Sequence, residues 1–114
     1  MRMWNVLPEY LCRKHLLGEH VEMHMFVGTI KRGVSLNGYI KNKLVETDKI
    51  VQRHNELVIE MKKRGYNHKS PIDDWECDFT VGEVDVEANL KELIKRCSSC
   101  KQRISNHKIK EHCV

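Results

Sequence analysis

The stretch from residue 9 to residue 30, EYLCRKHLLGEHVEMHMFVGTI, decides the fold. It contains no proline, and Pro8 just before it is tolerated in a first helical turn, so we predict one long helix from Glu9 to about Ile30. On a helical wheel of ~100° per residue, a polar strip with one aromatic runs along one side: His15, Glu19, Glu22 and Phe26. Apolar side chains cover most of the remaining circumference. A helix of this kind is largely buried, so we place it at the centre of a mainly α-helical protein.

The rest of the chain adds shorter elements. Residues 31–43, KRGVSLNGYIKNK, are rich in turn-forming residues and predict a loop. Thr47 and Asp48 offer an N-cap for a second helix that ends at Gly65, and Asp85 offers one for a third helix that runs through Lys95. We therefore expect a compact single domain over residues 1–114, a bundle of about three helices with irregular connections.

Composition sets wide limits. Lys and Arg outnumber Asp and Glu by 20 to 16 in the 114 residues, which gives a net charge of +4 and a pI of about 8.8. This mild basic excess suits a polyanionic partner without requiring one. The sequence has no run near the ~18 apolar residues of a membrane span and no secretory signal. We expect a monomeric cytoplasmic protein, of a bacterial cell or a phage-infected host, with no membrane partner.

The C-terminal segment, residues 97–114, carries a candidate metal site. The chain has five cysteines, an odd number, which in a reducing compartment read as thiols or metal ligands. Four ligands for a structural zinc are available as Cys97, Cys100 and His107 with either Cys113 or His112. A redox pair or incidental cysteines are the alternatives, and Cys12 and Cys77 are expected to be plain core thiols.

Two further histidines form an i, i+4 pair. His20 and His24 could ligate a metal together with a third group. They lie more than 100° around the wheel from the strip of His15 and Glu22, as judged at ~100° per residue. We therefore expect them to face solvent or DNA, and a metal-dependent nuclease built on them is an alternative function.

The first two residues raise the possibility of covalent chemistry. Methionine is removed mainly when the second residue is small, so Arg2 should leave Met1 with a free α-amine. Such an amine has a pKa of ~7.7–8.0, against ~10.4 for lysine, so part of it is neutral and nucleophilic at neutral pH. Attack on a sugar C1′ would displace a base and leave an imine, with Glu19 or Glu22 assisting. The alternative is that these are ordinary helix charges and a frayed chain end.

Longer sequence blocks favour the chemical interpretation. MRMWNV, HLLGEHVE, FVGTIKR and RHNELVIEMKKRGYN follow one another in residues 1–72. Together they resemble the phage pyrimidine-dimer DNA glycosylase family, whose members use an N-terminal amine as glycosylase and AP lyase. The matching positions at constant spacing are Arg2, His15, Glu19, Glu22, Gly28, Lys31 and Arg32, then Arg53, Leu57, Glu60, Arg64, Gly65, Tyr66 and Asn67.

The resemblance implies roles for individual residues. Met1 would supply the amine, Glu22 the catalytic carboxylate, and Arg2 and His15 would line the site beside it. Double-stranded DNA with a damaged or modified base would be the partner, and no cofactor is needed for the chemistry. The resemblance implies that Lys31 and Arg32 hold the DNA backbone. Further basic side chains expected to contact DNA are Arg13, Lys14, Arg53 and Arg64.

The chain also departs from the family. Val21 and Met25 stand where the dimer-specific enzyme has arginines, and the aromatic-rich tail of that enzyme is missing. Flipping a nucleotide costs several kcal/mol, which such contacts repay. The expected activity is therefore excision of a damaged or modified base, such as a pyrimidine dimer, with coupled strand nicking. The alternative from another class is a non-catalytic, zinc-containing DNA-binding protein.

Overall fold

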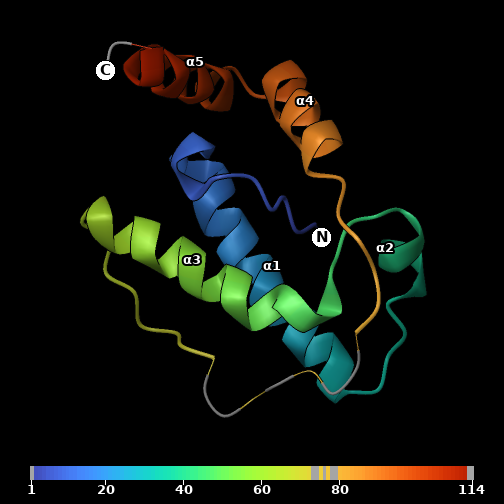
Figure 1. The fold of residues 1–114 in the computed structure, drawn as a ribbon. Helices are drawn as coiled ribbons and strands as arrows, with labels where there is room; N and C mark the ends of the chain where they lie inside the picture. The colour runs from blue at the N-terminus through green and yellow to red at the C-terminus, as the bar shows by residue number, and fades with distance from the viewer. Residues whose placement is uncertain (1, 73–74, 76, 78–79, 113–114) are drawn as a thin grey trace.

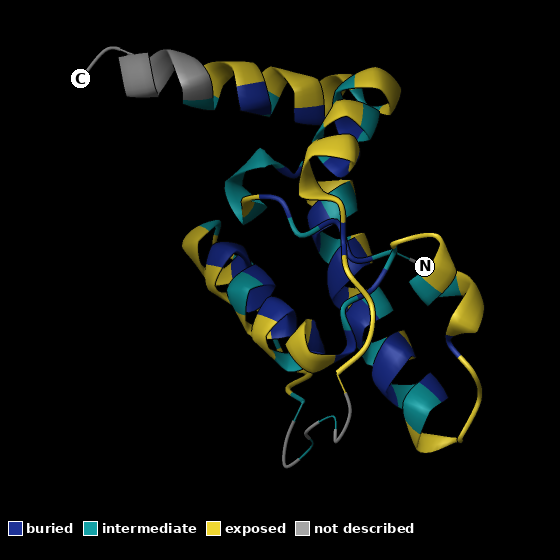
Figure 2. Cartoon of the chain, turned by 45° about the vertical axis from the view of Figure 1, so that its right-hand side comes forward, coloured by how far each residue is buried: buried dark blue, intermediate teal, exposed yellow. Residues whose placement is uncertain are grey.

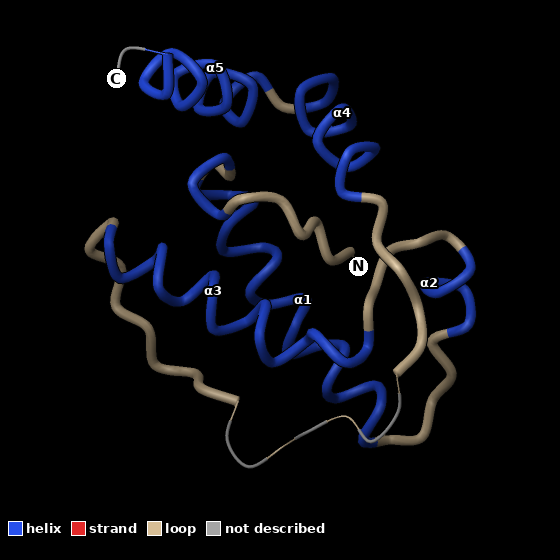
Figure 3. The backbone as a smooth tube through the Cα atoms, viewed as in Figure 1, coloured by secondary structure: helices blue, strands red, loops and turns tan. Residues whose placement is uncertain are grey.

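A computed structural model describes residues 2–72, 75, 77 and 80–112, with side chains described up to residue 107. The described part is mainly α-helical and contains no strand, as predicted (Figures 1 and 3). Five α-helices and two short 3-10 helices follow in order: η1 (Pro8–Tyr10), α1 (Arg13–Lys31), α2 (Asn37–Lys41), η2 (Thr47–Lys49), α3 (Ile50–Lys63), α4 (Val86–Arg96) and α5 (Ser98–His112). None of the helices in these residues is long and apolar enough to cross a membrane.

The first long helix starts later than predicted. Residues Pro8–Tyr10 form η1, and the Leu11 amide closes this turn on the Pro8 carbonyl at 3.1 Å. Leu11 then adopts an extended conformation and is fully buried, so the chain changes direction before α1 begins at Arg13. Burial of Leu11 therefore outweighs the helix propensity of residues 9–12. The centre of the molecule is α1, which packs against α3 as predicted for a largely buried helix (Figure 1).

The second predicted helix also begins later. The Thr47 hydroxyl does not cap it, because this oxygen donates to the Val81 carbonyl at 3.0 Å and accepts from the Val81 amide at 2.9 Å. Residues Thr47–Lys49 form η2, and α3 begins at Ile50. The predicted loop of residues 31–43 contains the one-turn helix α2.

A glycine allows the segment before α4 to cross close to the segment before η2. Gly82 has φ +92°, and a Cβ atom there would lie 2.3 Å from the Val45 carbonyl oxygen. Only glycine permits both this conformation and this approach. The crossing leads to α4, which the Asp85 carboxylate caps by accepting from the Ala88 amide at 3.0 Å, as predicted.

The C-terminal segment is helical. Cys97 alone separates α4 from α5, and α5 packs against η1 (Figure 1). The prediction of about three helices missed α5 because its residues were considered only as metal ligands. The N-terminal segment lies beneath this helical pair, and its Met3 and Trp4 are buried with 0% and 5% exposure (Figure 2).

Candidate active site and metal centre

The N-terminal segment is held by backbone hydrogen bonds on the side of α1. The Arg2 amide donates to Oε2 of Glu22 at 3.0 Å, and the Trp4 amide donates to Oε2 of Glu19 at 3.2 Å. Between them, the Met3 amide donates to the Leu44 carbonyl at 2.7 Å. Met1 itself lies outside the described residues. The Glu22 carboxylate therefore contacts the backbone of Arg2, the residue that follows Met1 in the sequence.

Asn89 of α4 fixes the same segment from the other side. Its Nδ2 donates to the Met3 carbonyl at 3.2 Å and to the Trp4 carbonyl at 2.8 Å, while its Oδ1 accepts from Arg2 Nη1 at 3.3 Å. Asn89 is buried, with 5% exposure. Sequence reasoning missed this residue, since a single asparagine in a helix carries no signal of a long-range partner.

Glu19 and Arg53 form a buried ion pair between α1 and α3. Arg53 Nε and Nη2 donate to the two Glu19 oxygens at 2.6 and 3.0 Å, and the Arg53 side chain is 2% exposed. Burial raises the pKa of Glu19, although hydrogen bonds and charge from Arg53 oppose this shift. The predicted DNA contact of Arg53 is wrong, because this guanidinium is enclosed and joins two helices.

Arg2 lies over an aromatic ring beside a second arginine. The guanidinium carbons of Arg2 and Arg96 are 4.5 and 5.6 Å from the centroid of the Trp4 ring, respectively. Burial, followed by repulsion from Arg96, lowers the pKa of Arg2. This places two cationic groups near the N-terminal segment, which suits a polyanionic ligand.

His15 lies among cysteines. Its Nδ1 is 3.2 Å from Cys12 Sγ and 3.5 Å from Cys100 Sγ, and Cys12 Sγ is 3.8 Å from Cys97 Sγ. Zinc–ligand distances of ~2.3 Å for sulfur and ~2.05 Å for nitrogen imply S···S and S···N separations of about 3.8 and 3.6 Å in a tetrahedral site. The four ligand atoms, all within 4.8 Å of one another, match that arrangement. This cluster of Cys12, His15, Cys97 and Cys100, hereafter the cysteine cluster, has the donor set and spacing to hold a metal ion.

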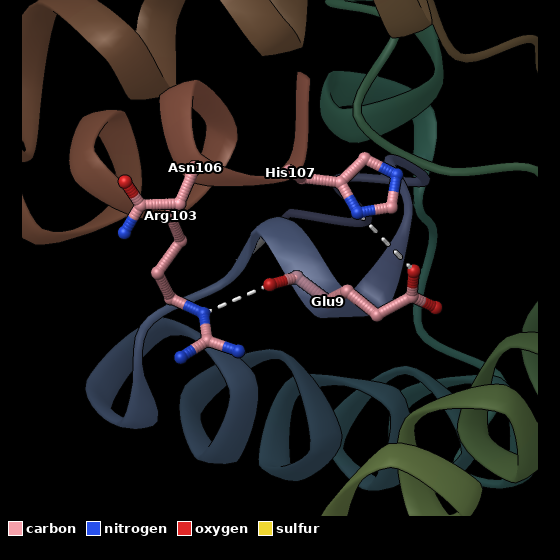
Figure 4. Close-up of a pocket in the computed structure, with 4 residues that line it drawn as sticks. All are labelled: Glu9, Arg103, Asn106 and His107. Carbon is pink, nitrogen blue, oxygen red and sulfur yellow. Dashed lines mark hydrogen bonds and ion pairs between the residues drawn. The ribbon is translucent and has the colours of Figure 1, made fainter. Parts of the chain in front are cut away.

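The cysteine cluster corrects two predictions. Cys12 is one of its members rather than a plain core thiol. His15 also belongs to the cluster through Nδ1, while its ring packs edge-on against Trp4, so its predicted place beside Glu22 stays a prediction. His107 is not a member: its Nδ1 lies 3.8 Å from a Glu9 carboxylate oxygen (Figure 4). The His112 side chain and Cys113 fall outside the described residues. Sequence reasoning had a usable signal here, because Cys12 and His15 repeat the two-residue gap of Cys97 and Cys100.

The two thiols of the C-x2-C pair differ in their electrostatics. Burial raises the pKa of Cys100 to about 12. Burial also opposes ionisation of Cys97, yet hydrogen bonds, first among them one from the Cys100 backbone amide at 3.4 Å, lower the pKa of Cys97. A bound divalent cation would favour the thiolate of both.

His107 packs α5 against η1 and does not join the cysteine cluster (Figure 4). Arg103 Nε donates to the Glu9 carbonyl at 2.8 Å, and the His107 ring packs edge-on against Tyr10 with centroids 5.1 Å apart. Glu9, Arg103, Asn106 and His107 line a cavity of about 270 Å³ between η1 and α5 (Figure 4). Their contacts hold α5 on η1.

Comparison with known families identifies the N-terminal two thirds of the chain. The family described as pyrimidine dimer DNA glycosylase matches residues 1–74. The chain belongs to the pyrimidine dimer DNA glycosylase family. The match contains both Glu22 and the anchored N-terminal segment, whereas Asn89, Cys97 and Cys100 lie beyond it. Searches of curated proteins and of solved structures give no match.

The basic residues in the family match fall into two groups. Arg13, Lys14, Lys31 and Arg32 are exposed, as a DNA contact requires. Arg64 is largely covered, because its Nε pairs with Glu60 at 3.1 Å and its Nη2 donates to the Pro8 carbonyl at 3.1 Å. Some of the charged residues that match the family pattern, such as Arg53 and Arg64, therefore stabilise contacts between elements of this protein.

Two exposed apolar residues lie on α1 close to Glu22. Val21 and Met25, on α1 beside Glu22, are 54% and 49% exposed. They line a shallow groove of about 320 Å³ with His24, Gly28, Thr29 and Arg32. The surface next to Glu22 is thus largely apolar, and the Arg32 guanidinium adds a charge to it.

Proposed function

We propose that the protein is a DNA glycosylase with coupled AP lyase activity, in which the Met1 α-amine is the nucleophile and Glu22 the catalytic carboxylate. The observation that carries this proposal is the 3.0 Å hydrogen bond from the Arg2 amide to Glu22 Oε2. This bond supports the proposal because Arg2 directly follows Met1 in the sequence, within a chain that belongs to a family of DNA glycosylases.

In the proposed reaction the neutral amine attacks C1′ of the target nucleotide. The glycosidic C–N bond breaks, and the base departs with the bonding electrons and takes up a proton. The nitrogen, now bonded to C1′, loses its protons as the sugar ring opens, which gives an imine with a hydroxyl at C4′. Glu22 then removes a C2′ proton, and the C3′–O bond breaks to release the 3′ phosphate.

Arg2 and Asn89 are proposed as positioning residues for this chemistry. Asn89 fixes the Met3 and Trp4 carbonyls and the Arg2 guanidinium, so the segment that carries the amine has a defined direction. The exposed Lys31 and Arg32 at the end of α1 are proposed to bind DNA phosphates. The apolar groove at Val21 and Met25 favours a damaged or modified base whose contacts differ from those of a phosphate-clamped dimer.

Borohydride trapping tests the nucleophile. Untagged protein, with Met1 verified by intact mass, is incubated with ultraviolet-irradiated DNA and with abasic-site DNA. A covalent adduct that maps to the Met1 amine supports the proposal, and comparison of the two substrates separates base excision from lyase activity alone. No adduct on either DNA would refute it, and nicking that requires a divalent ion would favour a metal-dependent nuclease.

Substitution tests the carboxylate. Glu22→Gln should lower strand nicking by about 10²–10⁴-fold, the usual contribution of a general acid or base, while DNA binding survives. Glu83→Gln, which changes an exposed carboxylate outside the site, is the matched control and should keep full activity. If Glu22→Gln abolished binding as well, Glu22 would be structural.

We also propose that the cysteine cluster binds structural zinc. Its distances fit a tetrahedral Cys3His site, and it joins the start of α1 to the junction of α4 and α5. Zinc stoichiometry after dialysis tests this proposal: Cys12→Ser should lose the metal, whereas Cys77→Ser, outside the cluster, should keep it. A zinc-free protein of equal thermal stability would refute the proposal.

A further inference from the structure

Four histidines from separate parts of the sequence lie together behind α1. The ring centroids of His20, His24, His54 and His68 form contacts of 4.7 to 5.4 Å. His20 and His54 are 6% and 1% exposed, so the predicted solvent-facing position of His20 is wrong. This histidine cluster joins α1, α3 and the connection that follows α3.

The nitrogen atoms converge at metal-binding distance. His20 Nε2 and His68 Nε2 are 3.0 Å apart, and the nearest ring nitrogens of His20, His54 and His68 all lie within 4.8 Å of one another. Two imidazole ligands on one tetrahedral zinc would be about 3.3 Å apart. A small inward adjustment of His54 would therefore place three ligands around one ion.

The His54 ring has a hydrogen-bond acceptor opposite each of its two nitrogens, which is one more than a neutral imidazole can satisfy. His54 Nδ1 lies 3.0 Å from Asn55 Oδ1, and His54 Nε2 lies 3.2 Å from the Ser70 carbonyl oxygen. Both partners are acceptors, but a neutral imidazole has one N–H. If Nδ1 donates to Asn55, the Nε2 lone pair lies opposite the Ser70 carbonyl oxygen, which is also 3.0 Å from His68 Nε2; this is the tautomer that a metal ligand needs, and a cation between these atoms would relieve the contact.

A second observation points to a missing partner. His24 Nε2 is buried and is the one described side-chain nitrogen or oxygen in the buried set without a hydrogen-bond partner. Its ring lies beside His20 and His54, at 4.9 and 4.8 Å. Buried polar atoms are nearly always paired, and a water or ion held within the cluster would supply the partner that Nε2 lacks. The Ser70 backbone also bonds to the His24 ring, which opposes the lowering of the His24 pKa by burial.

We propose that His20, His54 and His68 bind a transition-metal cation through their Nε2 atoms, at a site separate from the cysteine cluster. Imidazole ligands suit Zn²⁺, Co²⁺, Ni²⁺ and Cu²⁺. Burial of His20 and His54 makes the site closed, which is typical of a structural rather than a catalytic metal. The ion fastens the connection after α3, through His68, to both central helices.

Metal titration of the full-length, chelator-treated protein tests the site, with Co²⁺ as the spectroscopic probe and Zn²⁺ as competitor. Two equivalents are expected, one with sulfur-to-cobalt charge-transfer absorption and one with ligand-field bands only. Cys12→Ser should abolish the first and leave the second. His68→Asn should abolish the second, while His107→Asn, a histidine outside the cluster, should keep both.

Asn55→Ala keeps the result interpretable if His68→Asn fails to fold. Asn55 is exposed and touches the proposed site only through His54 Nδ1, so its loss should weaken binding of the second equivalent by about 10–100-fold. A single equivalent that follows the cysteines would overturn the inference. So would a second equivalent that is unchanged in both His68→Asn and Asn55→Ala.

Discussion

Asn89→Ala should destabilise the protein through the N-terminal segment. The substitution removes three hydrogen bonds and leaves the Met3 and Trp4 carbonyls without their α4 donor. Each bond contributes about 1 kcal/mol, and a buried group left unpaired costs about 1–3 kcal/mol. The higher helix propensity of alanine offsets about 0.5 kcal/mol. The expected loss in free energy of unfolding is therefore about 2–4 kcal/mol.

Urea unfolding monitored by circular dichroism measures this loss, with metal content kept equal between variants. Lys91→Ala, an exposed change in the same helix, is the control and should shift stability by less than about 0.5 kcal/mol. Strand nicking should fall in parallel, because the segment that carries the proposed amine loses its anchor. If Asn89→Ala were as stable as Lys91→Ala, the proposal that Asn89 holds the N-terminal segment in place would be refuted.

Three further predictions follow from the charged and titratable groups. Arg53→Met should lower the free energy of unfolding by about 3–5 kcal/mol, because it leaves the buried Glu19 carboxylate without its partner. Adding Glu19→Gln should recover much of that loss. If the two substitutions instead lowered stability by equal amounts that simply add, the ion pair would be contradicted. Burial, then the neighbouring histidines, lowers the pKa of His20 to about 4 from 6.5, so metal-free protein should be fully stable above pH 6.5 and lose at most about 3 kcal/mol as the pH falls towards 4. A pH titration of urea midpoints checks this, and an equal acid loss in His20→Gln would assign it to other groups. Arg32→Ala should reduce the slope of log affinity for DNA against log salt by about 0.9, measured by fluorescence anisotropy, whereas an unchanged slope would exclude a phosphate contact.

The sequence predicted the features that depend on local pattern. The central helix, the Asp85 cap and the mainly helical class follow from periodicity and capping, and the structure confirms them. The helix starts were less accurate. Burial of Leu11 and the pairing of Thr47 with Val81 are tertiary effects, and they override local propensity.

The candidate site also combines residues that the sequence pattern marks with residues that only tertiary packing brings together. Glu22 and Arg2 were proposed from the family pattern, and the structure brings the Arg2 amide to the Glu22 carboxylate; their catalytic role stays a prediction. The cysteine cluster was half predicted: the C-x2-C pair was recognised, but its partners come from the other end of the chain. The sequence offered His20 and His24 as possible ligands, but Asn89 and the partners His54 and His68 could not be predicted, since each depends on how distant segments pack.

The hydrogen bonds that hold the N-terminal segment also have a consequence for the order of folding. Residues 2–4 are made before their partners, which include Leu44 and Asn89, and the chain between them passes through the close crossing at Gly82. Contacts between such distant residues form late, because loop closure over a long stretch precedes any gain from them. The amides of Arg2, Met3 and Trp4 should therefore gain protection from hydrogen exchange last, together with α4. Residues 2–4 therefore complete their structure only after a segment more than eighty residues later in the sequence, which includes Asn89, has been made.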